Sequence, residues 1–321
     1  MTRPLTDILR DPEADLAGCF GDPRPDPPPA GPPYSGGPPA LAGELDPAME
    51  GRPLAELCAK VTGLDVEEAA GLVRFGGMWI DAHPKFMPEL PLPGKGEFRV
   101  NFPAYGQKFF YEADPGRIVY EDDAVIVYDK ESGRPSQAVP YDAYNNVTAA
   151  LGRLTGLELR LSHRLDAGTS GLILSAKTKK DAGALGKAFE GGRVSKRYLA
   201  LSAGDGPDWE ERVCEASIAK HAGRMLARAN GPGVWARTAL RALARRGGRT
   251  LFLAIPHTGR THQIRLHLSF EGHPVMGDRF YGGAPWPRLM LKASGLAFPH
   301  PRTGRTVRLG EPWDAEGAVS G

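Results

Sequence analysis

The amino-acid sequence predicts an α+β fold, in which antiparallel strands are interspersed with helices. The composition is globular, since 41% of the 321 residues are hydrophobic and 24% are charged. Apolar alternation predicts strands at residues 196–202, 212–218, 235–243 and 249–256. Helical patterns lie before these strands, at residues 142–154 and 180–189, and after them, at residues 261–270. Strands and helices mixed in this order are typical of an α+β domain.

Residues 1–50 are expected to form a Pro/Gly-rich, disordered tail. The segment at residues 22–40 is nearly half proline, which excludes a helix or a central strand. A linker or tail is favoured over a peptide ligand for an aromatic groove. We therefore expect that removal of residues 1–46 leaves the activity of the rest of the chain intact.

A small α/β module is expected next, at residues 51–106. Helical spacing begins at Leu54, a second short helix fits residues 66–74, and strands fit residues 75–83 and 96–102. A larger domain is expected at residues 107–321. It opens with a strand, an acidic turn and a second strand over residues 118–130.

The most informative stretch is a polar turn, His163-Arg164-Leu165-Asp166, followed by small residues and the apolar run 172–174. The apolar run predicts a buried strand. This layout would hold the Asp166 carboxylate at the rim of a sheet, flanked by Arg164 and His163. The alternative is an Asx-turn, in which the carboxylate bonds only its own backbone.

Composition and motifs exclude several classes of protein. The sequence contains no run of about 18 apolar residues, so we expect no transmembrane helix. The N-terminus has no secretory signal pattern, and three distant cysteines form neither a zinc motif nor a disulfide framework. We expect a cytoplasmic protein with free thiols. No phosphate loop, zincin motif or G-x-S-x-G elbow is present.

The charge is distributed unevenly along the chain. Residues 1–150 hold 13 Lys and Arg against 24 Asp and Glu, whereas residues 151–321 hold 27 against 14. A basic second half fits a polyanionic partner such as RNA, although a solvated Arg-rich surface would give the same count.

Four blocks in the second half resemble the motifs of the pseudouridine synthases, in the branch that modifies large ribosomal RNA and some transfer RNAs. The H-R-L-D turn is followed by T-S-G, and the remaining blocks come in the family's order. These are Lys196-Arg197-Tyr198, T-G-R-T-H-Q-I-R-L-H at residues 258–267, and G-H-P-V-M-G-D at residues 272–278 with Tyr281-Gly282. The resemblance spans residues 118–301 and implies a mixed, mainly antiparallel sheet with flanking helices.

The resemblance implies that uridines already in RNA are isomerised to pseudouridine, without a cofactor or a metal. Asp166 matches the nucleophile, and attack on the ribose or on the uracil ring both remain open. Arg265 matches the arginine that pairs with this carboxylate, and a surface salt bridge on its own helix is the alternative. Tyr198 matches the aromatic residue that stacks on the target base, and a core tyrosine is the alternative.

Four further residues are expected to bind substrate: Arg164, His163, Arg260 and Leu291. Arg164 matches the residue that fills the place of an extruded base in some relatives, and phosphate binding is the alternative. Arg260 is expected at a backbone phosphate, and Leu291 at the wall of the uracil pocket. The chain departs from the family at Ala167-Gly168, where Arg-Asp is common, and at Lys292, where His is common.

The module at residues 51–106 resembles a small alpha-L RNA-binding module. It departs from that pattern because its helices carry Glu56, Asp65, Glu67 and Glu68 in place of basic residues, so a structural remnant is an equal alternative. We expect a monomeric enzyme that acts on ribosomal or transfer RNA. An RNA-binding protein on the same fold without turnover is the rival interpretation, and a hydrolase using Asp166 is a third.

Overall fold

The computed structural model describes residues 5–11, 13–20, 41–74, 77–81, 83–85, 87–100, 111–138, 145–221 and 223–310. The chain divides into two compact units, which are described separately. The first consists of Met1–Pro27, Gly116–Gly133 and Arg160–Gly321, and the second of Pro28–Pro115 and Arg134–Leu159.

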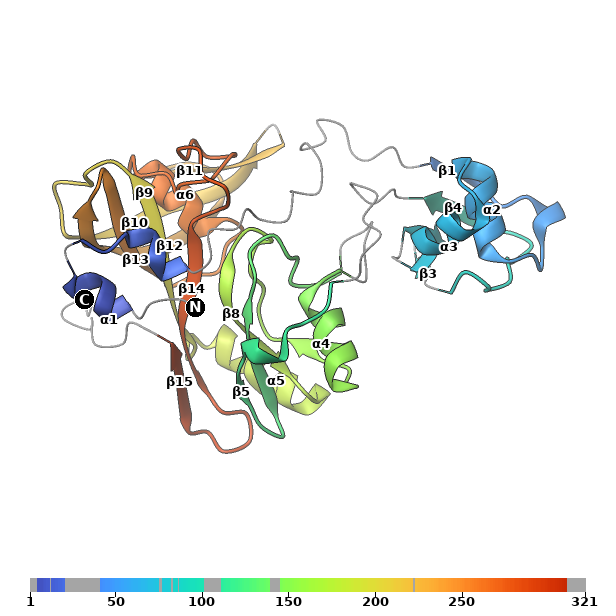
Figure 1. The fold of residues 1–321 in the computed structure, drawn as a ribbon, viewed down its shortest axis with the longest axis horizontal. Coiled ribbons are helices and arrows are strands. Elements are labelled where there is room, and N and C mark those ends of the chain that lie inside the picture. Colours follow the sequence, from blue (N-terminus) through green and yellow to red (C-terminus); the bar gives the residue numbers. More distant parts are fainter. Residues whose placement is uncertain are drawn as a thin grey trace. The chain divides into compact units, whose positions relative to one another are not determined.

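The first unit is built on one large mixed sheet, in which the described strands follow the order β11-β10-β12-β13-β9-β14-β8-β6-β5 (Figure 1). In addition, β15 pairs with β14 and β7 pairs with β8. Of these pairs only β14 and β8 are parallel, so the predicted α+β fold with a mainly antiparallel sheet is confirmed. The bounds are β5 Ile118–Glu121, β6 Val125–Lys130, β7 Arg160–Leu161, β8 Ser170–Ala176, β9 Ser195–Ala203, β10 Glu211–His221, β11 Arg224–Arg228, β12 Val234–Arg246, β13 Arg249–Pro256, β14 Leu291–Pro299 and β15 Thr306–Gly310.

The predicted buried strand after the polar turn is β8, all seven residues of which are buried. Its parallel contact with β14 is close, because Gly171 pairs with Ala293. Gly171 has φ +106°, and a Cβ atom there would collide with the carbonyl group of Ala293. Only glycine meets both requirements at low cost, so this residue fixes the end of the polar turn beside β14.

Two helices cover different parts of this sheet. Helix α5 (Lys179–Glu190) is capped at its N-terminus by Thr178, whose side chain accepts a hydrogen bond from the Asp181 amide. Its Leu185 packs in a core with residues of β6, β8 and β14. Helix α6 (Gln263–Phe270) packs Leu266 against Ile218 and Ala236 of β10 and β12. The predicted helix at residues 261–270 therefore begins two residues later than expected.

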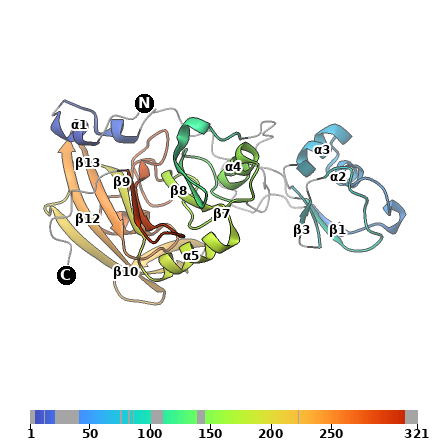
Figure 2. The same ribbon diagram turned by 90° about the horizontal axis from the view of Figure 1, so that it is seen from below.

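The interpretation of residues 1–50 as an unpacked tail is wrong for residues 5–11, 13–20 and 41–50. The first unit includes α1 (Leu5–Arg10), which is labelled in Figure 2, and the 3-10 helix η1 (Leu16–Phe20). Both helices bury apolar side chains. Arg246 at the end of β12 donates hydrogen bonds to the carbonyls of Ile8 and Asp11. Asp15 forms an ion pair with Arg249 at 2.8 Å. The proline-rich segment at residues 22–40 lies outside the described residues.

The second unit contains the predicted small α/β module. Its four-stranded sheet has the order β1-β4-β2-β3, with bounds β1 Leu41–Glu44, β2 Met78–Ile80, β3 His83–Lys85 and β4 Glu97–Val100. The helices are η2 (Pro47–Met49), α2 (Leu54–Thr62), α3 (Val66–Arg74) and α4 (Val147–Thr155). A core of apolar residues joins α2, α3 and this sheet. The predicted helix at residues 142–154 corresponds to α4, and residues 142–144 lie outside the described residues.

We predict that α1 contributes to the stability of the first unit. Ile8 is fully buried, whereas the neighbouring Leu9 is 37% exposed. Ile8→Ala should lower the free energy of unfolding by roughly 2–5 kcal/mol, because a buried side chain is lost and a cavity remains. Leu9→Ala should change it by less than about 0.5 kcal/mol, as is usual for surface positions. Denaturant unfolding measures both, and equal small effects would show that α1 does not pack in solution.

Candidate active site

The polar turn lies between β7 and β8, and the backbone directly after it is held from the end of β6. The buried Lys130 Nζ donates to the Ala167 carbonyl at 2.9 Å, and the Ser132 hydroxyl donates to the Gly168 carbonyl. The Thr169 amide donates to the Asp166 carbonyl at 3.0 Å. Among the described residues, the Asp166 carboxylate makes no hydrogen bond within its own turn. The Asx-turn alternative is therefore wrong, and the carboxylate points out of the turn.

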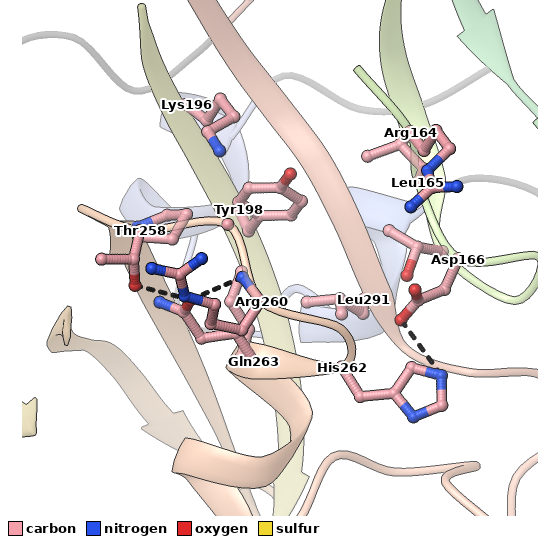
Figure 3. Close-up of a pocket in the computed structure, with 14 residues that line it drawn as sticks. Arg164, Leu165, Asp166, Lys196, Tyr198, Thr258, Arg260, His262, Gln263 and Leu291 are labelled. Carbon is pink, nitrogen blue, oxygen red and sulfur yellow. Dashed lines mark hydrogen bonds and ion pairs between the residues drawn. The ribbon is translucent and has the colours of Figure 1, made fainter. Parts of the chain in front are cut away.

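Asp166 belongs to the lining of a pocket that is assembled from four parts of the sequence (Figure 3). Asp166 and His262 lie on one side of this pocket, Lys196 and Tyr198 lie on the other, and Leu291 lies between them. The lining residues are Arg164, Leu165, Asp166, Thr169, Lys196, Tyr198, Pro256, Thr258, Gly259, Arg260, His262, Gln263, Ile264 and Leu291. Among the sequence-predicted site residues, Asp166, Tyr198, Arg164, Arg260 and Leu291 therefore meet at one place.

Arg265 on α6 approaches the nucleophile candidate but does not belong to the pocket lining. Its Nη1 atom lies 3.5 Å from Asp166 Oδ2. Its other contacts go to Asp278, because Nε and Nη2 donate to the two oxygens of this carboxylate at 2.6 and 2.8 Å. The bidentate partner of Arg265 is thus Asp278, and Asp166 receives only the remaining nitrogen. The alternative of a surface salt bridge is excluded, since the Arg265 side chain is 7% exposed.

The positive charge of Arg265 is stabilised by Asp278 and by neighbouring aromatic rings. Burial opposes the charged form, but the hydrogen bond and charge of Asp278 outweigh burial and raise the pKa of Arg265. The guanidinium also lies over the rings of Tyr281 and Phe280, at 5.0 and 5.6 Å from their centroids. The site therefore keeps one fixed positive charge beside Asp166.

Tyr198 and Lys196 lie two residues apart on β9, so both side chains face the pocket. Tyr198 is 8% exposed, and burial together with the charge of Asp166 raises its pKa. Its phenol is therefore protonated at neutral pH. Burial lowers the pKa of Lys196. Leu291 is buried on β14, where it pairs with Ala200 of β9, and provides an apolar wall beside Tyr198.

The T-G-R loop before α6 is organised by the buried side chain of Gln263. Its Oε1 accepts hydrogen bonds from the Thr258 hydroxyl at 2.7 Å and the Arg260 amide at 3.0 Å. Its Nε2 donates to the carbonyl of Arg237 and to the hydroxyl of Thr238. This network leaves the Arg260 side chain exposed at the rim of the pocket. Arg164 is exposed at the same rim, from the polar turn.

His163 does not line the pocket, in contrast to the expectation that it binds substrate. Its Nε2 accepts a hydrogen bond from the Leu174 amide at 3.2 Å, and its ring packs on Phe189 of α5 at 5.3 Å between centroids. Burial and the charge of Lys196 lower its pKa to about 3, so the ring is neutral. His163 therefore joins the polar turn to β8 and α5.

Three titratable residues at or beside the site were not among the sequence-predicted site residues: Lys196, His262 and Asp278. All three stand inside the matched blocks, so the motifs could have pointed to them. The residue types alone did not indicate what these side chains do. The fold shows that Asp278 contacts Arg265 and that His262 Nε2 lies 3.8 Å from Asp166 Oδ2.

Comparisons with known proteins identify a family. A family model described as RNA pseudouridylate synthase matches residues 124–270. Ribosomal large subunit pseudouridine synthase C of Salmonella typhimurium is 33% identical over 221 residues, covering 61% of this chain and 66% of that protein. The protein of that name from Salmonella typhi is 32% identical, covering 62% of this chain and 67% of that protein. The chain thus spans just under two thirds of the length of the first of these relatives.

Two solved human structures resemble the fold. RNA Pseudouridylate Synthase Domain Containing 1 aligns with a TM-score of 0.51 and 26% identity, covering 63% of this chain and 86% of that one. RNA Pseudouridylate Synthase Domain Containing 4 aligns with a TM-score of 0.50 and 23% identity, covering 61% and 87%. The second likeness concerns the fold alone.

We predict that Asp278→Asn strongly destabilises the protein. Asp278 is fully buried with Arg265, and removal of one partner of a buried ion pair costs roughly 3–5 kcal/mol because a charge remains unpaired. Asp181→Asn is a matched control. Asp181 is also buried, but its partner Arg302 is 45% exposed, so water can solvate the released guanidinium. The loss should be smaller in the control, and equal losses in denaturant unfolding would contradict the central place of the Arg265–Asp278 pair.

Proposed function

The chain belongs to the RNA pseudouridylate synthase family, and we propose that it isomerises specific uridines in structured RNA to pseudouridine. In this reaction the bond between the ribose and N1 of the base breaks, the uracil turns, and its C5 is joined to the ribose. The reaction is a rearrangement within one nucleotide, so it requires neither an oxidant nor a second substrate. It does require a group that can form and release a covalent bond, and a carboxylate serves this purpose.

The observation that carries this proposal is the position of Asp166. Its side chain is 28% exposed in a pocket with a tyrosine and a leucine side chain, and an arginine stabilises its negative charge from 3.5 Å. A carboxylate on one side of a pocket, with an aromatic ring on the opposite side and an apolar wall between them, fits a planar base that is to be attacked. We assign the nucleophile to Asp166 and the charge-stabilising contact to Arg265.

Tyr198 and Leu291 form the part of the pocket that would receive the uracil ring. A base in a helix or stacked loop must leave its stack before it reaches such a pocket, and an aromatic side chain compensates for part of the lost stacking. Tyr198 keeps its proton at neutral pH, so we assign to it a stacking role. Arg164 at the rim is suited to fill the place that the extruded base leaves.

RNA would approach the rim that carries Arg164 and Arg260, within the basic half of the chain. The relatives are named for the large ribosomal subunit, which favours ribosomal RNA as substrate, with transfer RNA as the alternative. We assign RNA contacts to the first unit, because α3 of the second unit exposes Glu67 and Glu68. None of the described helices is long and apolar enough to cross a membrane. We further propose that the protein acts as a monomer in the cytoplasm.

Asp166→Asn tests the proposed function. The amide is nearly isosteric with the carboxylate but cannot act as an anionic nucleophile, so pseudouridine formation should fall below detection. The melting temperature and RNA affinity should stay close to those of the parent. Chemical mapping of pseudouridine in ribosomal and transfer RNA, on the same preparation, gives the readout. Turnover by a verified Asp166→Asn sample would refute the role of Asp166, and a parent that binds RNA but converts none would favour the binding-only rival.

Arg260→Ala tests the approach of RNA to the rim. Affinity for RNA should fall with salt, since Lys and Arg side chains release counterions from phosphates. Loss of one phosphate contact should weaken binding and reduce the slope of log affinity against log salt by about one. Arg305→Ala is the control, because Arg305 is exposed in the turn before β15 and outside the pocket lining. Equal slopes for the two variants would place Arg260 away from the phosphates.

A further inference from the structure

His262 occupies a strained position next to the candidate nucleophile. Its backbone is left-handed, with φ 55° and ψ 21°, at the residue before α6. Among the described residues only Asp81 shares a positive φ without being glycine. Such a conformation costs of order 1–3 kcal/mol and persists where the surroundings enforce it, often at active sites. The His262 side chain does not cap α6 but points to Asp166 (Figure 3).

The contact with Tyr281 bears on which nitrogen of His262 carries the proton. The Tyr281 hydroxyl lies 2.6 Å from Nδ1. Burial raises the pKa of Tyr281, so this hydroxyl keeps its proton and can donate it to Nδ1. Burial lowers the pKa of His262, although the charge of Asp166 acts in the opposite direction. A neutral imidazole that accepts at Nδ1 carries its hydrogen on Nε2.

The Nε2 hydrogen is directed at one oxygen of the Asp166 carboxylate. Nε2 lies 3.8 Å from Oδ2, and Arg265 Nη1 lies 3.5 Å from the same atom. In the part of the chain that the structure describes, no donor contacts Oδ1. The two oxygens of the carboxylate are therefore different: one lies between two donors, and the other is free. Long contacts of this kind commonly tighten when a substrate closes the site.

We propose that His262 is a positioning residue that, with Arg265, holds Oδ2 of Asp166 so that Oδ1 is the oxygen that attacks the target uridine. This inference rests on the proposed function. A carboxylate turns about a broad, roughly two-fold torsion, and a single contact at 3.5 Å leaves that rotation open. Arg265 contacts Asp166 through Nη1 alone, since Nε and Nη2 donate to Asp278. The Nε2–H group of His262 supplies that second contact.

The assignment is consistent for both possible sites of attack. If Oδ1 attacks the ribose carbon, the electron pair of the glycosidic bond passes to N1 of the uracil. If Oδ1 attacks C6 of the ring, the electron pair of the C5–C6 double bond moves toward the C4 carbonyl oxygen. In both cases the carboxylate becomes an ester whose carbonyl oxygen is Oδ2. His262 and Arg265 can then contact Oδ2 before and after the bond forms, and stabilise its charge again when the bond breaks.

Two substitutions separate hydrogen bonding from packing. His262→Gln keeps an N–H donor near the position of Nε2, whereas His262→Leu has a similar size and no donor. Single-turnover pseudouridine formation by His262→Leu should be slower by about 10- to 100-fold, the range for loss of a hydrogen bond to a charged group. The Gln variant should recover most of the rate, and both should bind RNA like the parent. Equal rates in the two variants would overturn the inference.

Tyr281→Phe gives a pH test. The charged and titratable groups that face His262 are Asp166, Arg265, Asp278 and Tyr281. In the parent, the lowered pKa of His262 keeps the ring neutral at and above its usual value near 6.5, so the rate should not change through that pH. Without the Tyr281 hydroxyl, Nδ1 is free to take a proton, and a cationic ring would pair with Asp166. The rate of Tyr281→Phe should therefore fall as the pH drops below about 6.5, and a profile identical to the parent would contradict the inference.

The tautomer can be measured without activity. Nitrogen-15 NMR of the parent protein labelled at histidine should show His262 with a bare Nδ1 and a protonated Nε2 at neutral pH, and should show a change in Tyr281→Phe. A proton on Nδ1 in the parent would overturn the inference even if the enzyme is active. A parent with the expected tautomer but no pseudouridine formation would instead refute the proposed function, which keeps the two failures distinct.

Discussion

The buried pair of Arg265 and Asp278 is the interaction on which the rest of the site depends. The pair joins α6 to the segment that follows this helix. Two of the three guanidinium nitrogens donate to Asp278, and the third, Nη1, lies 3.5 Å from Asp166. Asp278 Oδ1 also accepts hydrogen bonds from the amides of Phe280 and Tyr281 at 3.0 and 3.3 Å. One carboxylate thereby places both the cation beside Asp166 and the phenol that contacts His262.

The parts of this protein that sequence patterns predicted are those in which the information is local. The polar turn at residues 163–166 is bounded by small residues and a short apolar run, so the strand β8 and the place of Asp166 could be predicted together. The partner of Arg265 could not, because carboxylates at 166 and 278 are equally plausible until the chain is folded. His262 was missed for a similar reason, since its role comes from a left-handed backbone and from Tyr281, 19 residues away.

Strand β14 and helix α1 are among the elements that escaped prediction, and the stability of both comes from distant contacts. Strand β14 is interrupted by Gly295, and its apolar and polar residues do not alternate clearly. It forms because it lies between β9 and β8 and pairs with both. Helix α1 has only six residues, too few for a helical pattern to stand out. Its capping contacts come from Arg246, more than two hundred residues later in the chain. The proline content of residues 22–40 therefore gave no information on whether α1 packs.

The backbone just after the polar turn is held through its carbonyl oxygens, which has a consequence for substitutions at these positions. Lys130 and Ser132 contact the carbonyl oxygens of Ala167 and Gly168, and every amino acid supplies a carbonyl oxygen. These two hydrogen bonds do not depend on the side chains at positions 167 and 168. The two positions nevertheless differ, because a Cβ atom at Gly168 would lie 3.3 Å from the Leu289 side chain, whereas Ala167 is exposed. Position 167 can therefore change without loss of the hydrogen bond from Lys130, while a larger residue at position 168 requires Leu289 to move.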